Sequence, residues 1–287
     1  MWSKFEYMKP GTLGEALDIL SKHKREVIIY AGGTDVLVSM REGEIKPKYV
    51  IDIKGLKDLN KIKTNNGQFS LGTLVTWSAL MNSGTLQKRI PILCEAAKVF
   101  GSPQIRNKAT IGGNICTASP SCDLGPVLLV LDAELMIVGK RRKRTIPIKK
   151  FFLKRKETSL AKNEILSEIL VKAPSKDTVS TFLKHRRTGV DLAIVNVAVV
   201  AKVKKNKFES IKIALGGVAP TPIRAVEAEE KLKGAGCTDE NIETAAEIAS
   251  GETRPISDVR ASAEYRKELA KVLVKRAIKS ALEKMGG

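Results

Sequence analysis

"ATIGGNICTASPSCDLGP", residues 109–126, combines a glycine pair with small polar side chains and two prolines, and an apolar run at 127–131 follows it directly. A second glycine pair with similar neighbours occurs earlier, in "IIYAGGTDVLV" at 28–38. A strand that ends in Gly-Gly and passes into a helical turn exposes backbone N–H groups, and without a Cβ in the way a phosphate can approach them closely. Two such loops could hold both phosphates of a dinucleotide, although either glycine pair alone is more often a simple tight turn.

The two loops offer hydroxyls, backbone amides, a side-chain amide and a possible helix cap, from Thr34, Asp35, Thr110, Gly112, Gly113 and Asn114. Neither loop has the G-x-G-x-x-G spacing of dinucleotide-binding folds or the G-x-x-x-x-G-K-[ST] spacing of P-loops. The local chemistry therefore allows a phosphate site without identifying the ligand.

Length and composition bound the fold. The chain has 287 residues, 43% of them hydrophobic, which is enough for two or three domains. No window approaches the roughly 18 uninterrupted apolar residues of a membrane span, and the start "MWSKFEYMKPGTLGEAL" has no apolar signal region. We therefore expect a cytoplasmic protein with no membrane span.

Cysteine and histidine spacing argues against a metal centre in this chain. The four cysteines form no C-x-x-C pair and lack the plant-type iron–sulfur spacing; they are Cys94, Cys116, Cys122 and Cys237. The two histidines, His23 and His185, have no nearby ligand-like partner. No metal site and no Ser–His or Cys–His pair is expected, so any redox chemistry would come from a bound organic cofactor.

The net charge of +19 invites a nucleic-acid interpretation, but the basic residues are dispersed. Their densest run, "GKRRKRTIP" at 139–147, lies between two strand-like segments and is typical of a solvated hairpin turn. Aromatic residues are only 5% and do not alternate with basic ones, so the sequence has no stacking platform for bases. Docking to an acidic partner subunit is favoured over nucleic-acid binding, and a hot-growing source would also enrich lysine.

Hydrophobic periodicity predicts a mixed N-terminal half. Thr12 and Glu15 form a capping box ahead of an apolar helical face, which predicts a helix over 12–24. Further predicted elements are strands at 26–30 and 49–53, a short helix from Thr34 or Asp35 to Met40, a hairpin at 61–72 turning at Asn66-Gly67, a buried helix at 91–101, paired strands at 133–139 and 144–148, and a strand at 164–174.

The pattern changes near Pro174–Thr178, where we place a domain boundary. Segments 181–187, 193–205 and 208–220 predict a three-stranded antiparallel meander with a turn at Lys205-Asn206. A helical tail ends in an amphipathic helix at about 261–284, with inward residues Leu269, Leu273, Ile278 and Leu282. Strands followed by helices indicate an α+β domain with its own core.

Several motifs together carry a family resemblance. "AGGTD" at 31–35, "TIGGN" at 110–114 and "ASPSCDLGPVLL" at 118–129 resemble the FAD-binding medium subunit of molybdenum hydroxylases, the xanthine dehydrogenase and carbon monoxide dehydrogenase family. "EIL" at 164–166, "TFLKHRR…DLA" at 181–193 and "ALGGVAPTPIRA" at 214–225 continue the resemblance in family order. Motifs in the correct order are more specific than either glycine pair alone.

The resemblance implies an α+β fold in three parts. A two-subdomain FAD-binding fold of the PCMH/vanillyl-alcohol-oxidase type would occupy 1–175, with an N-terminal subdomain at about 1–56 and a middle subdomain at about 57–175 that clasp the FAD between them. A C-terminal α+β flavoprotein domain would occupy 176–287.

Carried over by position, the resemblance implies two groups of pyrophosphate contacts, which are Ile29, Tyr30, Ala31, Gly32, Gly33, Thr34, Asp35 and Val36 on one side and Thr110, Ile111, Gly112, Gly113 and Asn114 on the other. It also places Phe100, Asp123, Leu166 and Lys184 near the FAD. Alternatives remain open: Phe100 as a core aromatic, Asp123 as a helix N-cap, and Lys184, where the alignment needs a one-residue gap, as a surface lysine. No catalytic side chain is expected.

The resemblance further implies an oxidoreductase subunit that transfers electrons. Substrate would be oxidised at molybdopterin on a large partner subunit, and electrons would pass through [2Fe–2S] clusters of a small partner subunit to FAD on this chain and then to an external acceptor. The complex would be a dimer of heterotrimers. The alternative is a free-standing FAD-dependent oxidoreductase, against which the lack of a general base counts. This chain specifies neither the substrate nor the acceptor (NAD, quinone or oxygen).

Overall fold

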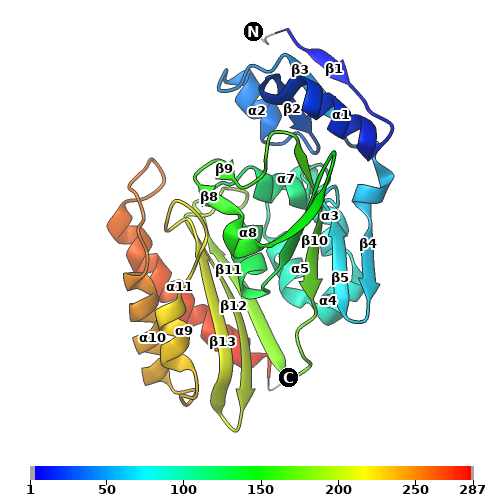
Figure 1. The fold of residues 1–287 in the computed structure, drawn as a ribbon. Helices are drawn as coiled ribbons and strands as arrows, with labels where there is room; N and C mark the ends of the chain where they lie inside the picture. Colours follow the sequence, from blue (N-terminus) through cyan, green and yellow to red (C-terminus); the bar gives the residue numbers. More distant parts are fainter. Residues whose placement is uncertain (1–3, 286–287) are drawn as a thin grey trace.

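The computed structural model describes residues 4–285. Three parts follow one another along the chain, with the blue N-terminal subdomain at one end, the cyan and green middle subdomain below it, and the yellow-to-red C-terminal domain beside the middle one (Figure 1). Among the described residues, no helix combines the length and the apolarity that crossing a bilayer requires.

A three-stranded parallel sheet of order β1-β3-β2 organises the N-terminal subdomain. Its elements are β1 Glu6–Met8, α1 Leu13–His23, β2 Val27–Tyr30, α2 Val36–Arg41 and β3 Tyr49–Asp52. Thr12 caps α1 as predicted, because its hydroxyl accepts the N–H of Glu15 at 3.1 Å, while the Glu15 carboxylate accepts the N–H of Gly11 at 2.8 Å.

An antiparallel five-stranded sheet of order β4-β5-β10-β6-β7 forms the middle subdomain. Its strands are β4 Ile62–Asn65, β5 Gln68–Gly72, β6 Glu134–Gly139, β7 Lys143–Pro147 and β10 Glu164–Lys172, with a small hairpin of β8 Phe152–Lys154 and β9 Glu157–Thr158. Short helices cover it: α3 Trp77–Met81, α4 Gly84–Arg89, α5 Pro91–Lys98, α6 Pro103–Arg106, α7 Ile111–Cys116 and α8 Leu124–Val130. Asn66 and Gly67 both have positive φ, of 47° and 79°, which confirms the predicted hairpin turn.

The basic run forms the exposed hairpin turn expected between β6 and β7, at residues 140–142, and its later residues belong to β7 as predicted. Arg144 lies within β7, and its guanidinium donates to both carboxylate oxygens of Glu164 at 2.9 and 2.6 Å. The Glu164 side chain is only 4% exposed, so this ion pair is structural. Lys140, in the turn itself, pairs with Asp18 of α1 at 2.6 Å and links the middle subdomain to the N-terminal one.

The C-terminal domain has a four-stranded antiparallel sheet, where the sequence predicted three strands. Its elements are β11 Thr178–His185, β12 Val195–Lys204, β13 Lys207–Gly216, β14 Ile223–Arg224, α9 Val226–Leu232, α10 Asp239–Gly251 and α11 Ala263–Glu283. The additional strand β14 is two residues long, so it has no periodicity to detect. The predicted inward face of α11 is confirmed, since Leu273 and Ile278 are buried and Leu269 and Leu282 pack against the same core.

The C-terminal sheet is covered on both faces. Val197 and Val199 of β12 face the core formed with α9, α10 and α11, whereas Ala198 between them belongs to the core of the middle subdomain. Phe182 of β11 and Ala214 of β13 join Ala198 there, under α8. Figure 1 shows α8 lying against this sheet. The domain has its own core, as predicted, but it also completes its neighbour's.

Candidate functional site

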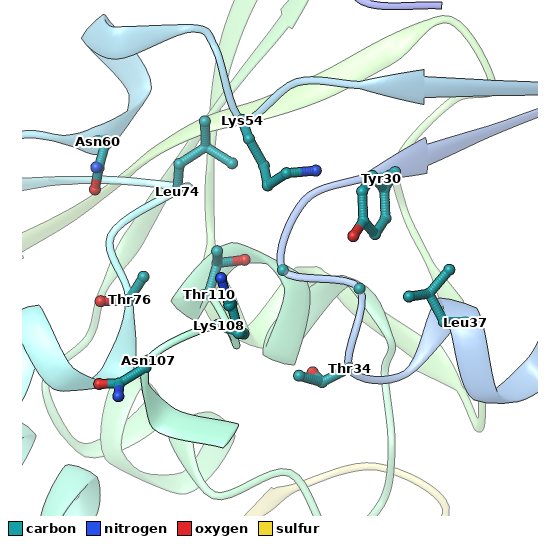
Figure 2. Close-up of a pocket in the computed structure, with 12 residues that line it drawn as sticks. Tyr30, Thr34, Leu37, Lys54, Asn60, Leu74, Thr76, Asn107, Lys108 and Thr110 are labelled. Atoms are coloured by element: carbon teal, nitrogen blue, oxygen red, sulfur yellow. The ribbon is translucent and has the colours of Figure 1, made fainter. Parts of the chain in front are cut away.

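A cleft of about 480 Å³ lies between the N-terminal and middle subdomains (Figure 2). One wall is formed by Tyr30, Gly32, Gly33, Thr34, Leu37 and Lys54. The facing wall is formed by Asn60, Leu74, Thr76, Asn107, Lys108 and Thr110. Five residues predicted from the glycine loops therefore line one cleft, from segments distant in the sequence. They are Tyr30, Gly32, Gly33, Thr34 and Thr110.

The loop after β2 presents backbone amides without intramolecular partners. Within residues 4–285, the N–H groups of residues 32–36 donate no hydrogen bond to the protein. The loop is held instead through its carbonyls, since Tyr30 O accepts from Ile53 N at 3.0 Å and Gly33 O accepts from Leu37 N at 3.1 Å. This is the arrangement that a bound anion requires.

The chain itself requires both glycines of this first loop. A Cβ on Gly32 would overlap the carbonyl oxygen of Lys108 and lie 2.9 Å from Ala109 Cα, so Gly32 sits where the two subdomains meet. Gly33 has φ 80°, a left-handed conformation, and a Cβ there would run into the Tyr30 ring. Asp35, at the N-cap position of α2, makes no side-chain capping hydrogen bond.

The second loop is built differently. Thr110 caps α7, its hydroxyl accepting the N–H of Gly113 at 3.1 Å, while Gly112 N–H donates to Thr73 O at 3.0 Å and Asn114 N–H donates to Thr110 O at 3.0 Å. The amides expected to be free are thus used within the chain. The Asn114 side chain is also engaged, because its oxygen accepts from the Cys122 thiol and from Leu124 N–H at 3.0 and 3.3 Å.

Asp123 and Lys184 contact each other rather than solvent. Their side-chain oxygen and nitrogen lie 2.6 Å apart, and the two side chains are only 3% and 2% exposed. The Asn196 amide donates to the second Asp123 oxygen at 2.8 Å. The surface-lysine alternative for Lys184 is therefore wrong, and Asp123 makes no side-chain capping bond at the start of α8. The pair joins the middle subdomain to β11.

Other predicted positions lie away from the cleft. Phe100 stacks on Trp77 with ring centres 3.9 Å apart, which agrees with the core-aromatic alternative. Leu166 and Ile111 are buried in the middle core, and Ile29 and Ala31 pack against the core of the N-terminal subdomain. Val36 begins α2 and, like Asp35, does not line the cleft. The roles of all these residues toward a cofactor stay predictions.

Two lysines that were not predicted from the sequence, Lys54 and Lys108, also line the cleft. The ammonium of Lys54 lies 2.8 Å from Asp52 and 3.4 Å from the centre of the Tyr30 ring. Asp52 is buried and also accepts the hydroxyl of Tyr7, a hydrogen bond that raises the pKa of Tyr7 to about 12. Lys108 is exposed and reaches into the cleft beside Thr110 (Figure 2). Lys54 could have been predicted as a site residue from its position directly after a predicted strand. No feature of the sequence distinguishes Lys108 as a site residue.

The cleft is equipped for binding rather than for acid–base or nucleophilic chemistry. It combines unpaired amides, two ammonium groups and threonine hydroxyls, which together suit a phosphate-bearing ligand. The four cysteines are free thiols that do not line it, and burial raises the pKa of Cys116 and Cys122 to about 12. Within the described residues, no three His, Cys, Asp or Glu side chains gather as a metal site would need.

Two families match the chain in succession. The family described as "FAD binding domain in molybdopterin dehydrogenase" matches residues 3–174. The family described as "CO dehydrogenase flavoprotein C-terminal domain" matches residues 180–281.

Relatives match at full length. The carbon monoxide dehydrogenase medium chain of Hydrogenophaga pseudoflava is 34% identical over 97% of this chain and 97% of its own. The xanthine dehydrogenase FAD-binding subunit of Escherichia coli O157:H7 is 31% identical over 100% of this chain and 99% of its own. The solved carbon monoxide dehydrogenase from Hydrogenophaga pseudoflava superposes with a TM-score of 0.97 at 34% identity, covering 99% of both chains. The chain therefore belongs to the FAD-binding medium subunits of the molybdenum hydroxylases, a family of oxidoreductases, and its cofactor is FAD.

Proposed function

We propose that this chain is the electron-transfer subunit of a three-chain molybdenum hydroxylase. A large subunit carrying molybdopterin would oxidise the substrate, and a small subunit carrying [2Fe–2S] clusters would deliver the electrons to FAD on this chain, from which an external acceptor takes them. The observation that carries the proposal is the cleft, which opens an amide nest between two subdomains in a chain that matches medium subunits end to end.

The residues at the cleft would bind and orient FAD, and FAD when bound supplies the redox chemistry. The residues of the first loop, from Ile29 to Val36, would hold the pyrophosphate with the amides of 32–36, and Thr110 to Asn114 would face them from the other wall. Gly32 lies against the backbone of Lys108, so the two walls meet at this point. Phe100, Asp123, Leu166 and Lys184 do not line the cleft and would contact parts of the FAD that extend beyond it, while the buried Asp123–Lys184 pair joins the middle subdomain to β11.

We further propose boundaries near residues 56 and 175, assembly as a dimer of heterotrimers, and a cytoplasmic location, which suits four unpaired cysteines.

The test separates this proposal from a free-standing oxidoreductase. The FAD-loaded chain is mixed anaerobically with an aldehyde, a purine or carbon monoxide, and the absorbance of oxidised flavin near about 450 nm, a property of the cofactor, is followed. We expect no bleaching from the chain alone and bleaching once both partner subunits are added. Bleaching by any substrate without the partners would overturn the three-chain proposal.

A further inference from the structure

The charges facing the cleft are unbalanced. Lys54 and Lys108 both line it, one from each wall. The ammonium of Lys108 forms no ion pair or hydrogen bond with residues 4–285. The acid paired with Lys54, Asp52, is 3% exposed and does not line the cleft; it is engaged with Tyr7 and with the Lys54 backbone N–H at 2.9 Å. The open space therefore meets positive charge on both sides.

Lys54 is positioned before any ligand arrives. Its ammonium is held between Asp52 and the face of the Tyr30 ring, and that ring is in turn braced by the backbone of Gly33. Gly33 lies close to the Tyr30 ring, since a Cβ there would overlap Tyr30 Cε2, and Lys54 lies over the ring, so Tyr30 supports the lysine. A charged donor that is already oriented loses little conformational entropy when it binds.

Lys108 offers an anion a hydrogen-bond donor on the wall where the backbone amides of the second loop are already bonded. The amides of Gly112 and Gly113 are bonded to Thr73 and Thr110, so they are not available to an anion without breaking those bonds. The wall that carries them still faces the first loop's amides across the cleft. Lys108, two residues before Thr110, provides a free cationic donor on that wall (Figure 2).

We propose that Lys54 and Lys108 together clamp the diphosphate of FAD, one lysine from each subdomain. The proposal rests on FAD occupying this cleft. Each ammonium would form a charge-assisted hydrogen bond to a phosphate oxygen, and the bridge would draw the two walls together on the ligand. The second glycine loop then shapes the wall, and Lys108 supplies its charge.

Binding of FAD to the deflavinated full-length chain tests the clamp. Lys108→Gln should weaken FAD binding about tenfold or more, because a hydrogen bond between charged groups is lost, and Lys108→Arg should restore most of it. The variant's affinity should also fall less steeply with added salt than that of the native chain. Lys149→Gln, at an exposed lysine that does not line the cleft, is the matched charge control and should bind normally.

Lys54 needs a second design, because removing it leaves the buried Asp52 without its ammonium. Lys54→Gln combined with Asp52→Asn removes both charges, and we expect it to lose FAD affinity by a similar factor while remaining folded by circular dichroism. ADP, which carries the diphosphate, should bind more weakly to both lysine variants, whereas adenosine should bind all variants equally.

Unchanged FAD and ADP affinity in both lysine variants would overturn the clamp and leave the electron-transfer role intact, since reduction of the native chain by its partner subunits tests that role separately. An equal loss for adenosine and ADP would overturn it too, because the effect would then be a general distortion of the cleft.

Discussion

The two glycine loops look alike in sequence and do different things in the structure. In "AGGTD" the amides of residues 32–36 have no partner within the described chain, and Gly33 adopts φ 80°. In "TIGGN" the pair begins a helix, and the amides of Gly112 and Gly113 are bonded to Thr73 and Thr110. The first loop is open to a ligand, whereas the second is closed on its own protein.

A glycine pair indicates that other atoms lie too close for a Cβ, but not whether those atoms belong to a ligand or to the protein itself. Gly32 is required by the backbone of Lys108 in the facing subdomain, and Gly112 is required by Thr73 in the same subdomain. The first contact lies on a seam between subdomains and the second inside a core. Substitutions should therefore affect ligand binding at the first loop and folding at the second.

The largest effect should come from Gly112→Ala. Its Cβ would overlap the Thr73 hydroxyl and lie 2.7 Å from the Thr73 carbonyl oxygen, with Ile111 and Ile115 fully buried beside it. We expect the free energy of unfolding to fall by about 3 kcal/mol, as in overpacked cores. Urea unfolding of the FAD-free chain measures it. A loss below about 1 kcal/mol would mean that the second loop is as adaptable as the first.

Gly32→Ala should instead weaken ligand binding. The added methyl group would push against Lys108 and Ala109 and separate the two subdomains slightly. FAD affinity should therefore fall about tenfold to a hundredfold, which corresponds to the free energy that one extra carbon usually costs in a tightly packed site. Urea unfolding of the FAD-free chain should change much less than for Gly112→Ala. An equal loss of stability in the two variants would contradict the proposed difference between a glycine at the subdomain boundary and a glycine inside the core.

Low pH should destabilise the first loop and not the second, because the Asp52–Lys54 ion pair supports Tyr30 beside the first loop. Burial alone would raise the pKa of Asp52, but hydrogen bonds from Lys54 and Tyr7 bring it below its usual value. A depressed carboxylate pKa stabilises the fold above the unfolded pKa of about 3.9, and this contribution is lost as pH falls through the folded pKa.

Asp52→Asn should accordingly cost about 1.5 kcal/mol at pH 7, and the difference from the native chain should begin to shrink as pH falls below about 3.9. Unfolding free energies of both chains between pH 7 and pH 3 measure this. The second loop is held by neutral groups, so the difference in unfolding free energy between Gly112→Ala and the native chain should not change with pH. A constant Asp52→Asn difference across that range would contradict the ionic support.

The smallest effect is at the caps. Thr110→Ala removes the acceptor for Gly113 N–H and should cost about 1 kcal/mol in the FAD-free chain, while Thr110→Ser retains the cap. Asp35→Ala at the corresponding position of the first loop should cost almost nothing, because Asp35 makes no capping bond. Thermal or urea unfolding of the three variants measures these differences. Equal losses of unfolding free energy for Thr110→Ala and Asp35→Ala would contradict the prediction that only the second loop has a side-chain cap.

Features that depend on residues close together in the sequence were predicted correctly. The capping box of Thr12, the hairpin turn at Asn66-Gly67 and the inward face of α11 each depend on residues a few positions apart, and each appears in the structure. The first loop's place at the cleft likewise followed from a strand meeting a glycine pair.

What the sequence could not show depends on distant partners. The closure of the second loop needs the Thr73 carbonyl, which has no side-chain signature. Asp123 resembled a helix cap because its partner Lys184 lies in another domain, 61 positions away. Lys108 is one of 50 basic residues, and only the arrangement of the two walls separates it from the others.

The shared C-terminal sheet limits how this chain can be recombined. Ala198, Phe182 and Ala214 turn one face of that sheet toward the middle subdomain, so a junction near residue 176 cuts through a single packed core. A chimera that took its last hundred or so residues from a relative would have to match those three side chains to α8, or fill the gap elsewhere. The chain could therefore be exchanged with that of a relative only as a whole, although its sequence matches two domain families.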